Sequence, residues 1–360
     1  MAEPLAPLLT SAVVGAPSAM TQRFFGMLLP AVYSDPEQEY AWLRQTVGVV
    51  DTGFQFAAEL TGPDARRYLN AVTTGNIRDL QPGQSALGLL LNAQAHILAE
   101  LLTLALDDRL LVLSHKMVAE RTLATLDRFI IMDDVTLTDL SAKLASVALL
   151  GPKAPVVFAS LGAEVADLAP GEHREVRLGG VQVRILRASL VGVPAWELLA
   201  DRSQLPELAQ QLVRSAAAAG GGPVGYEALN ILRVESGLAW FGADFDDRVI
   251  PHEAALEQSH ISYVKGCYTG QEIVERVRSR GHVNRRRLGL FFEGDQLPEP
   301  GTPLQASGRE AGWVTSAVRS PRLGRNIGMG YLRREFHSPG TRLEWTGGLA
   351  EVTSLPFSNP

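Results

Sequence analysis

The pattern of apolar residues changes near Arg287, and this change limits the possible folds more than any other feature of the chain. Before it, apolar runs that suit strands alternate with stretches of helical spacing, beginning at Gly48-Val49-Val50-Asp51. This alternation predicts an α+β fold with a mixed or antiparallel sheet. After Arg287, short apolar runs separated by Gly and Pro predict a small C-terminal β-barrel of about 75 residues.

The 360 residues, 46% hydrophobic and 20% charged, are enough for two or three globular domains with large cores. Residues 1 to about 45 contain several prolines and are expected to be helical or irregular. Glu3 stands where a signal peptide needs basic residues, and no later apolar run is long enough to span a bilayer. We therefore expect a cytoplasmic protein without a membrane partner. The net charge of −6 argues against broad, non-specific binding to nucleic acid.

Cys267 is the only cysteine, so one copy of the chain cannot form a disulfide or a multi-cysteine metal site. It lies in the octapeptide Lys265-Gly266-Cys267-Tyr268-Thr269-Gly270-Gln271-Glu272. Thr269 and Glu272 have the spacing of a capping box, which predicts that a helix begins there. A position just outside a helix N-terminus and near Lys265 favours a thiolate, so we predict that Cys267 is a functional thiol tuned by Lys265. Two alternatives stay open, a small buried side chain at Cys267 and a strand from Ile273 to Arg280.

A second candidate site lies at Leu232-Arg233-Val234-Glu235-Ser236-Gly237, which Trp240 follows. A carboxylate such as Glu235 beside aromatic rings suits a flat heterocycle whose ring nitrogens donate hydrogen bonds. Arg233 and Trp240 would complete this site. The alternative is a surface ion pair beside aromatic residues of the core.

An arginine cluster follows the octapeptide and makes this part of an acidic protein basic. It consists of Arg276, Arg278, Arg280, Arg285, Arg286 and Arg287. Such a cluster can hold a polyanion, either the phosphates of RNA or the carboxylates of a glutamylated cofactor. A solvated helix face explains the same pattern equally well.

Sequence templates of common enzymes are absent. The chain has no G-x-S-x-G nucleophile elbow, no H-E-x-x-H and no Walker loop. His252 with Glu253, or His260 with Cys267, would give metal ligands or a nucleophile pair, but neither pair has diagnostic spacing. We therefore predict no metal site.

The octapeptide resembles the signature of the YgfZ family, folate-binding proteins implicated in iron–sulfur cluster assembly or repair and thereby in tRNA modification. Over roughly residues 45 to 355, the chain also resembles the T-protein of the glycine cleavage system, a tetrahydrofolate-dependent aminomethyltransferase. The segments that carry the T-protein likeness are, in order, Gly48 to Asp51, Leu60 to Ala65, Leu91-Asn92, Leu232 to Gly237, Phe241 to Asp244 and the C-terminal barrel.

The resemblance implies a three-part arrangement around a central folate cavity, with the first two domains interleaved in sequence. These domains would be residues 1–50 with 140–225, residues 51–139 with 226–285, and the barrel at 286–360. The cofactor would be tetrahydrofolate or a one-carbon derivative. By the same resemblance, Glu235 would recognise the pterin ring with Arg233 as its neighbour, and Asn92 would lie near the reactive part of the folate.

One position departs from the T-protein pattern. T-proteins carry two aspartates after N-x-x-G-G-I-x, whereas this chain has Ala99 at the first of them and Glu100 at the second. In a strand these neighbouring side chains point to opposite faces, so we expect Glu100 to point away from the folate. Without a carboxylate at position 99, aminomethyl transfer would lose its electrostatic assistance.

We therefore expect a folate-binding protein that supports iron–sulfur cluster assembly or repair, and thereby tRNA modification, rather than a classical enzyme. Its partners would be folate, iron–sulfur enzymes or assembly factors, and tRNA through Arg285, Arg286 and Arg287. Two alternatives stay open, a folate-dependent one-carbon transferase of the aminomethyltransferase type and a tRNA-binding module.

Overall fold

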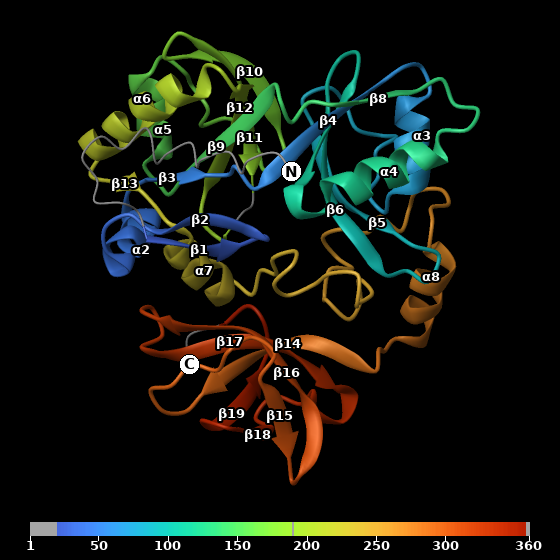
Figure 1. The fold of residues 1–360 in the computed structure, drawn as a ribbon, viewed down its shortest axis with the longest axis vertical. Helices are drawn as coiled ribbons and strands as arrows, with labels where there is room; N and C mark the ends of the chain where they lie inside the picture. The colour runs from blue at the N-terminus through green and yellow to red at the C-terminus, as the bar shows by residue number, and fades with distance from the viewer. Residues whose placement is uncertain (1–19, 189–190, 358–360) are drawn as a thin grey trace.

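The structure is a computed structural model that describes residues 20–188 and 191–357. Two sheets with their helices lie side by side, and a barrel lies across one end of both (Figure 1). The expected helical or irregular lead-in is wrong where Met20–Phe24 (β1) and Met27–Val32 (β2) pair as an antiparallel hairpin. Helix Pro36–Gln45 (α2) follows, and the earlier part of that expectation, residues 1–19, lies outside the described residues.

The first sheet has six strands in the order β10-β11-β12-β9-β3-β13. They are Gly48–Asp51 (β3), Leu144–Leu150 (β9), His173–Leu178 (β10), Val181–Ala188 (β11), Ala195–Asp201 (β12) and Gly222–Pro223 (β13). Neighbouring strands are antiparallel, except for the parallel pair β3 and β13.

Helices cover both faces of this first sheet. Ala154–Ser160 (α5) and Leu205–Ala218 (α6) share a core with one set of alternating strand residues, such as Leu149. Helices α2 and Tyr226–Glu235 (α7) share a second core with the other set, such as Leu150. The central strands β3, β9 and β12 are therefore buried on both sides, which explains their nearly continuous apolar runs.

The second sheet has five strands in the order β5-β6-β7-β4-β8. They are Gln55–Thr61 (β4), Ser85–Leu91 (β5), Ile97–Ala105 (β6), Leu110–His115 (β7) and Thr136–Asp139 (β8). Its outer face packs on the helices Ala65–Val72 (α3) and Ala119–Phe129 (α4), the second of which follows the short 3-10 helix Lys116–Val118 (η1). Its inner face meets the first sheet, where Leu104 and Leu113 pack with Leu186 and Leu199.

Strand β6 places one polar residue between the two sheets. Ile97, Ala99 and Leu101 are buried in the core beneath the helices. Because side chains alternate along a strand, Glu100 and Leu102 face the other way, toward the first sheet.

The C-terminal part forms a closed barrel in the order β14-β17-β16-β15-β18-β19, with β14 pairing β19. Helix Gln271–Arg280 (α8) precedes it. The strands are Arg285–Phe292 (β14), Pro303–Ala306 (β15), Arg309–Ser320 (β16), Arg325–Arg333 (β17), Arg342–Trp345 (β18) and Gly348–Thr353 (β19), and Arg334–Phe336 (η2) follows β17 as a 3-10 helix. Apolar side chains such as Leu290 and Leu343 fill the barrel.

The predicted α+β class and C-terminal barrel are confirmed. The domain boundaries stay a prediction. In the described part of the chain, no helix combines the length and the apolar character that crossing a membrane requires. The cytoplasmic placement also stays a prediction.

Candidate functional site

A cavity of about 600 Å³ lies between the two sheets. Residues 237–241, 255–256 and 259–260 also line it. This volume is typical of sites for small-molecule ligands. A smaller hollow of about 390 Å³ shares Arg187, Ala188 and Leu238 with the cavity, so the two adjoin.

Aromatic rings form one wall of the cavity. Phe25 stacks on Phe54 with ring centroids 4.2 Å apart, and Trp240 tilts against Phe25 at 5.0 Å. The ring of His115 stacks on Phe241 at 5.1 Å. All five residues line the cavity, so a flat ligand would meet ring faces and edges there.

Glu100 projects into this cavity from β6 and is held by two histidines. Its Oε2 accepts a hydrogen bond from His115 Nε2 at 3.1 Å, and its Oε1 accepts one from His260 Nε2 at 2.9 Å. Burial alone would raise the pKa of Glu100, but the bonds to His115 and His260 outweigh burial and hold this pKa well below its usual range. Glu100 is therefore ionised at rest.

Glu197 reaches the same cavity from β12 in the other sheet. Its side chain is fully buried, and neither carboxyl oxygen has a hydrogen-bond partner. Burial raises the pKa of Glu197 to about 7, and the nearby polar side chains of Ser146 and Gln55 offset this rise only in part. A buried carboxyl group with two free acceptors is costly unless a ligand supplies donors.

The cavity thus holds two carboxyl groups whose pKa values are shifted in opposite directions. The pKa of Glu100 is pushed down by its histidine partners, whereas that of Glu197 is pushed up by burial. Paired groups whose pKa values diverge in one cavity are a mark of acid–base or group-transfer sites.

Comparison with known families fits this geometry. The family described as GCVT N-terminal domain matches residues 11–260, and the family described as glycine cleavage T-protein C-terminal barrel domain matches residues 285–358. The chain belongs to the glycine cleavage T-protein family.

Curated and solved T-protein relatives match over nearly the whole chain. The aminomethyltransferase of Streptomyces avermitilis is 28% identical over 343 residues, which cover 93% of this chain and 92% of the relative. That of Herpetosiphon aurantiacus is 30% identical over 307 residues, covering 84% and 83%. The crystal structure of glycine cleavage system aminomethyltransferase T from Bartonella henselae has a TM-score of 0.86 and 25% identity, covering 94% of each chain.

These comparisons confirm the predicted T-protein-like fold and overturn the predicted function. We expected support of iron–sulfur cluster assembly or repair by a protein that is not a classical enzyme. The relatives that match most of this T-protein chain are instead named as aminomethyltransferases, which are enzymes. The iron–sulfur and tRNA terms of the prediction find no support in them.

The argument against transferase chemistry also fails on geometry. We expected Glu100 to point away from the ligand, because neighbouring side chains of a strand face opposite ways and position 99 was expected to face the folate. The alternation of β6 is as predicted, but its direction is the reverse: Ala99 is fully buried in the core beneath the helices, and Glu100 lines the cavity. The face of β6 toward the cavity therefore keeps a carboxylate.

Of the predicted cofactor-binding residues, Trp240 lines the cavity, whereas Arg233, Glu235 and Asn92 are not among its lining residues. Arg233 forms a buried ion pair with Asp244. The predictions for these residues as folate contacts stay predictions.

The other two predicted folate residues have partners within the protein. The carboxylate of Glu235 accepts hydrogen bonds from Tyr40 at 2.9 Å and from Ser320 of the barrel at 2.5 Å. Asn92 caps its own turn, since its Oδ1 accepts from the backbone amides of Gln94 and His96.

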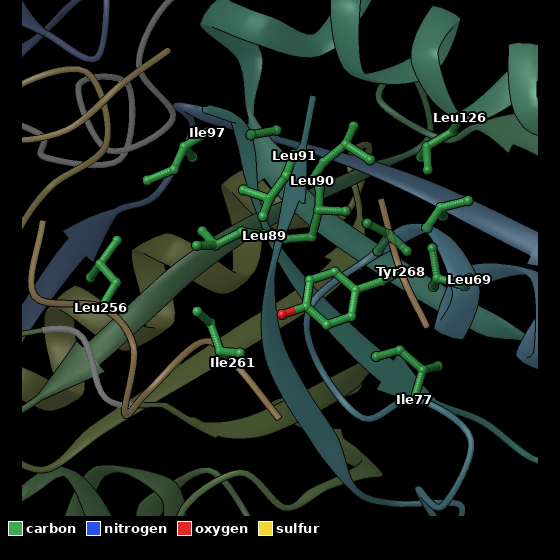
Figure 2. Close-up of a cluster of buried hydrophobic side chains, with 14 of the residues drawn as sticks. Leu69, Ile77, Leu89, Leu90, Leu91, Ile97, Leu126, Leu256, Ile261 and Tyr268 are labelled. Carbon is green, nitrogen blue, oxygen red and sulfur yellow. The ribbon is translucent and has the colours of Figure 1, made fainter. Parts of the chain in front are cut away.

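The octapeptide packs against the outer face of the second sheet, in the core that α3 and α4 cover. Tyr268 is buried among Leu69, Ile77, Leu89 and Ile261 (Figure 2). Gly270 has a φ of +82°, and a Cβ there would lie 2.7 Å from the carbonyl oxygen of Asn92. Only glycine combines this conformation with so close an approach to the turn between β5 and β6.

The lysine of the octapeptide is turned inward. Lys265 Nζ donates to the carbonyl oxygens of Asn70, Thr73 and Gly75, and burial followed by the nearby charge of Arg78 lowers the pKa of Lys265 to about 8. The ammonium thus ties the octapeptide to the loop that follows α3.

Cys267 is not the small buried side chain that was left open as an alternative, and helix α8 does not begin with the predicted capping box. Cys267 is exposed and is not among the residues that line the cavity. Helix α8 begins at Gln271, after Gly270, without a side-chain cap, so the predicted capping box at Thr269 and Glu272 is wrong. Glu272 is exposed and pairs with Arg276 at 2.7 Å, and Gly266 has open space around it. A thiol role for Cys267 stays a prediction.

The three arginines at the start of the barrel have partners within the chain. Arg285 pairs with Glu253 at 2.9 Å and Arg286 with Glu257 at 2.6 Å. Arg287 is buried, lines the cavity and donates to the carbonyl oxygen of Ala254 at 3.0 Å. Their contact with tRNA stays a prediction, as do the protein partners.

Within residues 20–188 and 191–357, no group of three or more His, Cys, Asp or Glu side chains is arranged to hold a metal ion. Sequence reasoning missed Glu197 and His115 and gave His260 a different partner. The signal for Glu197 was present, since one acidic residue interrupts the apolar run of Ala195–Asp201. The pairing of His115 and His260 with Glu100 depends on contacts between distant segments, which no local pattern contains.

Proposed function

We propose that this chain is a tetrahydrofolate-dependent one-carbon transferase of the aminomethyltransferase type. The observation that carries the proposal is the pair of carboxyl groups in one aromatic cavity, with Glu100 held charged and Glu197 buried without partners. The names of relatives that match over most of the chain support the same reaction class.

Glu197 would hold the pterin ring. A pterin presents a ring N–H and an amino group side by side, and this planar edge matches the two free oxygens of one carboxylate. The aromatic wall of Phe54 and Trp240 would pack against the ring system. Hydrogen bonds from these donors would offset the free-energy cost of burying the Glu197 carboxyl group. The unpaired oxygens of Glu197 therefore suit a pterin.

Glu100 would act at the centre of transfer. Tetrahydrofolate supplies nitrogen atoms that accept the one-carbon unit. Positive charge develops where a carbon leaves one nitrogen and joins another, and a carboxylate already ionised and oriented stabilises this charge without reorganisation. His115 and His260 keep Glu100 in that state through their hydrogen bonds of 3.1 Å and 2.9 Å.

The octapeptide, which resembles the YgfZ signature, also has a role in this proposal. Within it, the octapeptide supports the transfer site from outside, because Gly270 lies against the turn at Asn92 that leads into β6 and Glu100. Lys265 braces the neighbouring loop through three carbonyl groups. The segment would position the catalytic strand rather than supply a reacting atom.

The test is formation of methylenetetrahydrofolate from an aminomethylated carrier by the purified protein. We expect turnover by the wild type and a loss of about 10²- to 10³-fold in Glu100→Gln, because the amide keeps the shape but loses the charge. Glu207→Gln, at an exposed position on α6, is the matched control and should retain wild-type turnover. No product above background with the wild type, or equal rates for Glu100→Gln and the wild type, would reject the proposal.

A further inference from the structure

The two histidines that bind Glu100 are equally buried but differ in what lies behind them. His115 is 7% exposed and His260 is 6% exposed, and each offers Nε2 to one carboxylate oxygen. Their Nδ1 atoms have opposite surroundings. Because both histidines bind Glu100, they would be expected to have the same role. The different surroundings of their Nδ1 atoms give them different roles.

His115 has no further connection. Its Nδ1 is buried without a hydrogen-bond partner. The ring lies beside Phe25 and Phe54, each with centroids 5.3 Å away, and stacks on Phe241. Because Nδ1 has no hydrogen-bonded group behind it, His115 can orient Glu100 but does not continue the series of hydrogen bonds beyond it.

His260 continues toward solvent. Its Nδ1 lies 2.7 Å from Ser259 Oγ. Ser259 is exposed and also lines the cavity. An unbroken series of hydrogen bonds therefore runs from Glu100 Oε1 through both ring nitrogens of His260 to a hydroxyl group in contact with water.

We propose that Glu100, His260 and Ser259 form a proton relay between water and the cavity, with His115 as a positioning residue for Glu100. The proposal deepens the transferase function and rests on it for the use of the proton. A proton that enters at Ser259 reaches Nδ1 of His260, the proton on Nε2 passes to Glu100, and Glu100 delivers it to the departing amine. This transfer leaves the proton of His260 on Nδ1. When a folate nitrogen releases a proton, the same path runs in reverse, from Glu100 to Nε2 and from Nδ1 through Ser259 to water, which restores the starting tautomer.

The overall reaction balances with this relay. The transferred carbon keeps its two hydrogens, loses its bonds to the donor nitrogen and to the carrier atom, and forms two bonds to folate nitrogens. The two folate nitrogens lose two protons, and the amine and the carrier atom gain two. The relay supplies the proton for the amine as its bond to carbon breaks and the electron pair goes to nitrogen.

His260→Gln and His115→Gln form a matched pair of tests, since glutamine keeps an N–H donor for Glu100 but cannot pass a proton through a ring. We expect kcat to fall about 10- to 100-fold in His260→Gln with KM little changed, and a clearly smaller loss in His115→Gln. Added imidazole should restore part of the rate to His260→Gln alone. Equal losses in both variants, or no rescue by imidazole, would overturn the relay.

A second measurement tests the relay in the absence of catalytic turnover. Exchange of the Nε2 proton with solvent, followed by ¹⁵N-edited NMR of the histidine rings, should be severalfold faster at His260 than at His115 in the wild type. Ser259→Ala should slow the exchange at His260 only. Equal exchange at the two rings would overturn the relay even in an active enzyme, and fast exchange at His260 with no product formed would leave the relay standing and reject the transferase function.

Discussion

The octapeptide and the cavity differ in how their residues are distributed along the chain and in what their polar groups do. The octapeptide gathers its distinctive residues in one short segment, and its charged Lys265 is already satisfied by three carbonyl oxygens. The cavity takes single residues from separate strands, and neither carboxyl oxygen of Glu197 makes a well-formed hydrogen bond there, although Ser146 and Gln55 lie nearby. The most recognisable segment therefore has its charged group satisfied within the protein, whereas the unsatisfied groups lie where the proposed ligand would bind.

The largest effect in this comparison is expected for Lys265→Met. The substitution keeps a long buried side chain but leaves three carbonyl groups without their donor, which should lower the free energy of unfolding by about 4 kcal/mol. Urea denaturation measures this change. If stability is unchanged while transfer is abolished, Lys265 takes part in the reaction. The contrast between a structural octapeptide and a functional cavity is then wrong.

Glu197→Gln should act in the opposite direction on stability. The carboxyl group loses its proton near pH 4.5 when unfolded and near pH 7 when folded, so the folded protein binds more protons between these values. Stability of the wild type should therefore fall as pH rises through this window, by up to about 3 kcal/mol, and the variant should lack this loss. Urea unfolding of both proteins at pH 4.5, 6 and 8 tests it, and parallel profiles would show that Glu197 is not a buried, unpartnered acid.

Gly270→Ala should change the free energy of unfolding less than Lys265→Met or Glu197→Gln does. A φ of +82° and a Cβ placed 2.7 Å from the Asn92 carbonyl oxygen strain any side chain, at a cost of about 2 kcal/mol. Gly281→Ala, at a φ of +72° with open space around it, is the matched control for backbone strain without the clash. Similar losses of stability in the two variants would show that the close contact of Gly270 with the turn at Asn92 does not contribute to the effect.

The smallest effect is expected for Cys267→Ala. The thiol is exposed and outside the cavity lining, so stability should change by less than about 0.5 kcal/mol and methylenetetrahydrofolate formation should match the wild type. A large loss of transfer in this variant, with its fold intact, would return the thiol to the mechanism.

Much of the fold could be predicted from the sequence because it depends on local periodicity. The apolar residues from Ile97 onward form β6, Ile97–Ala105, and the predicted short runs beyond Arg287 form a closed barrel. Strand Pro303–Ala306 was missed, since it is short and carries a proline and a glutamine. Short strands of this kind are defined by their neighbours rather than by their own pattern.

The site was less predictable because it depends on which face a strand turns inward. Alternation correctly separated Ala99 from Glu100, but the packing of α3 and α4 on the second sheet decides which of them meets the cavity. Glu235 beside Trp240 stays a predicted ligand contact, and no pattern in the sequence indicates that Tyr40 and Ser320 from other elements donate hydrogen bonds to its carboxylate. Such contacts between distant segments have no local signal.

Calorimetric titration with tetrahydrofolate, comparing the wild type with Glu197→Gln and Cys267→Ala, tests the central claim most directly. The account predicts binding by the wild type and by Cys267→Ala with similar affinity, and binding at least about tenfold weaker in Glu197→Gln, because the amide replaces one of two acceptors with a donor. Equal affinity in the wild type and Glu197→Gln, or binding that depends on Cys267 instead, would contradict it.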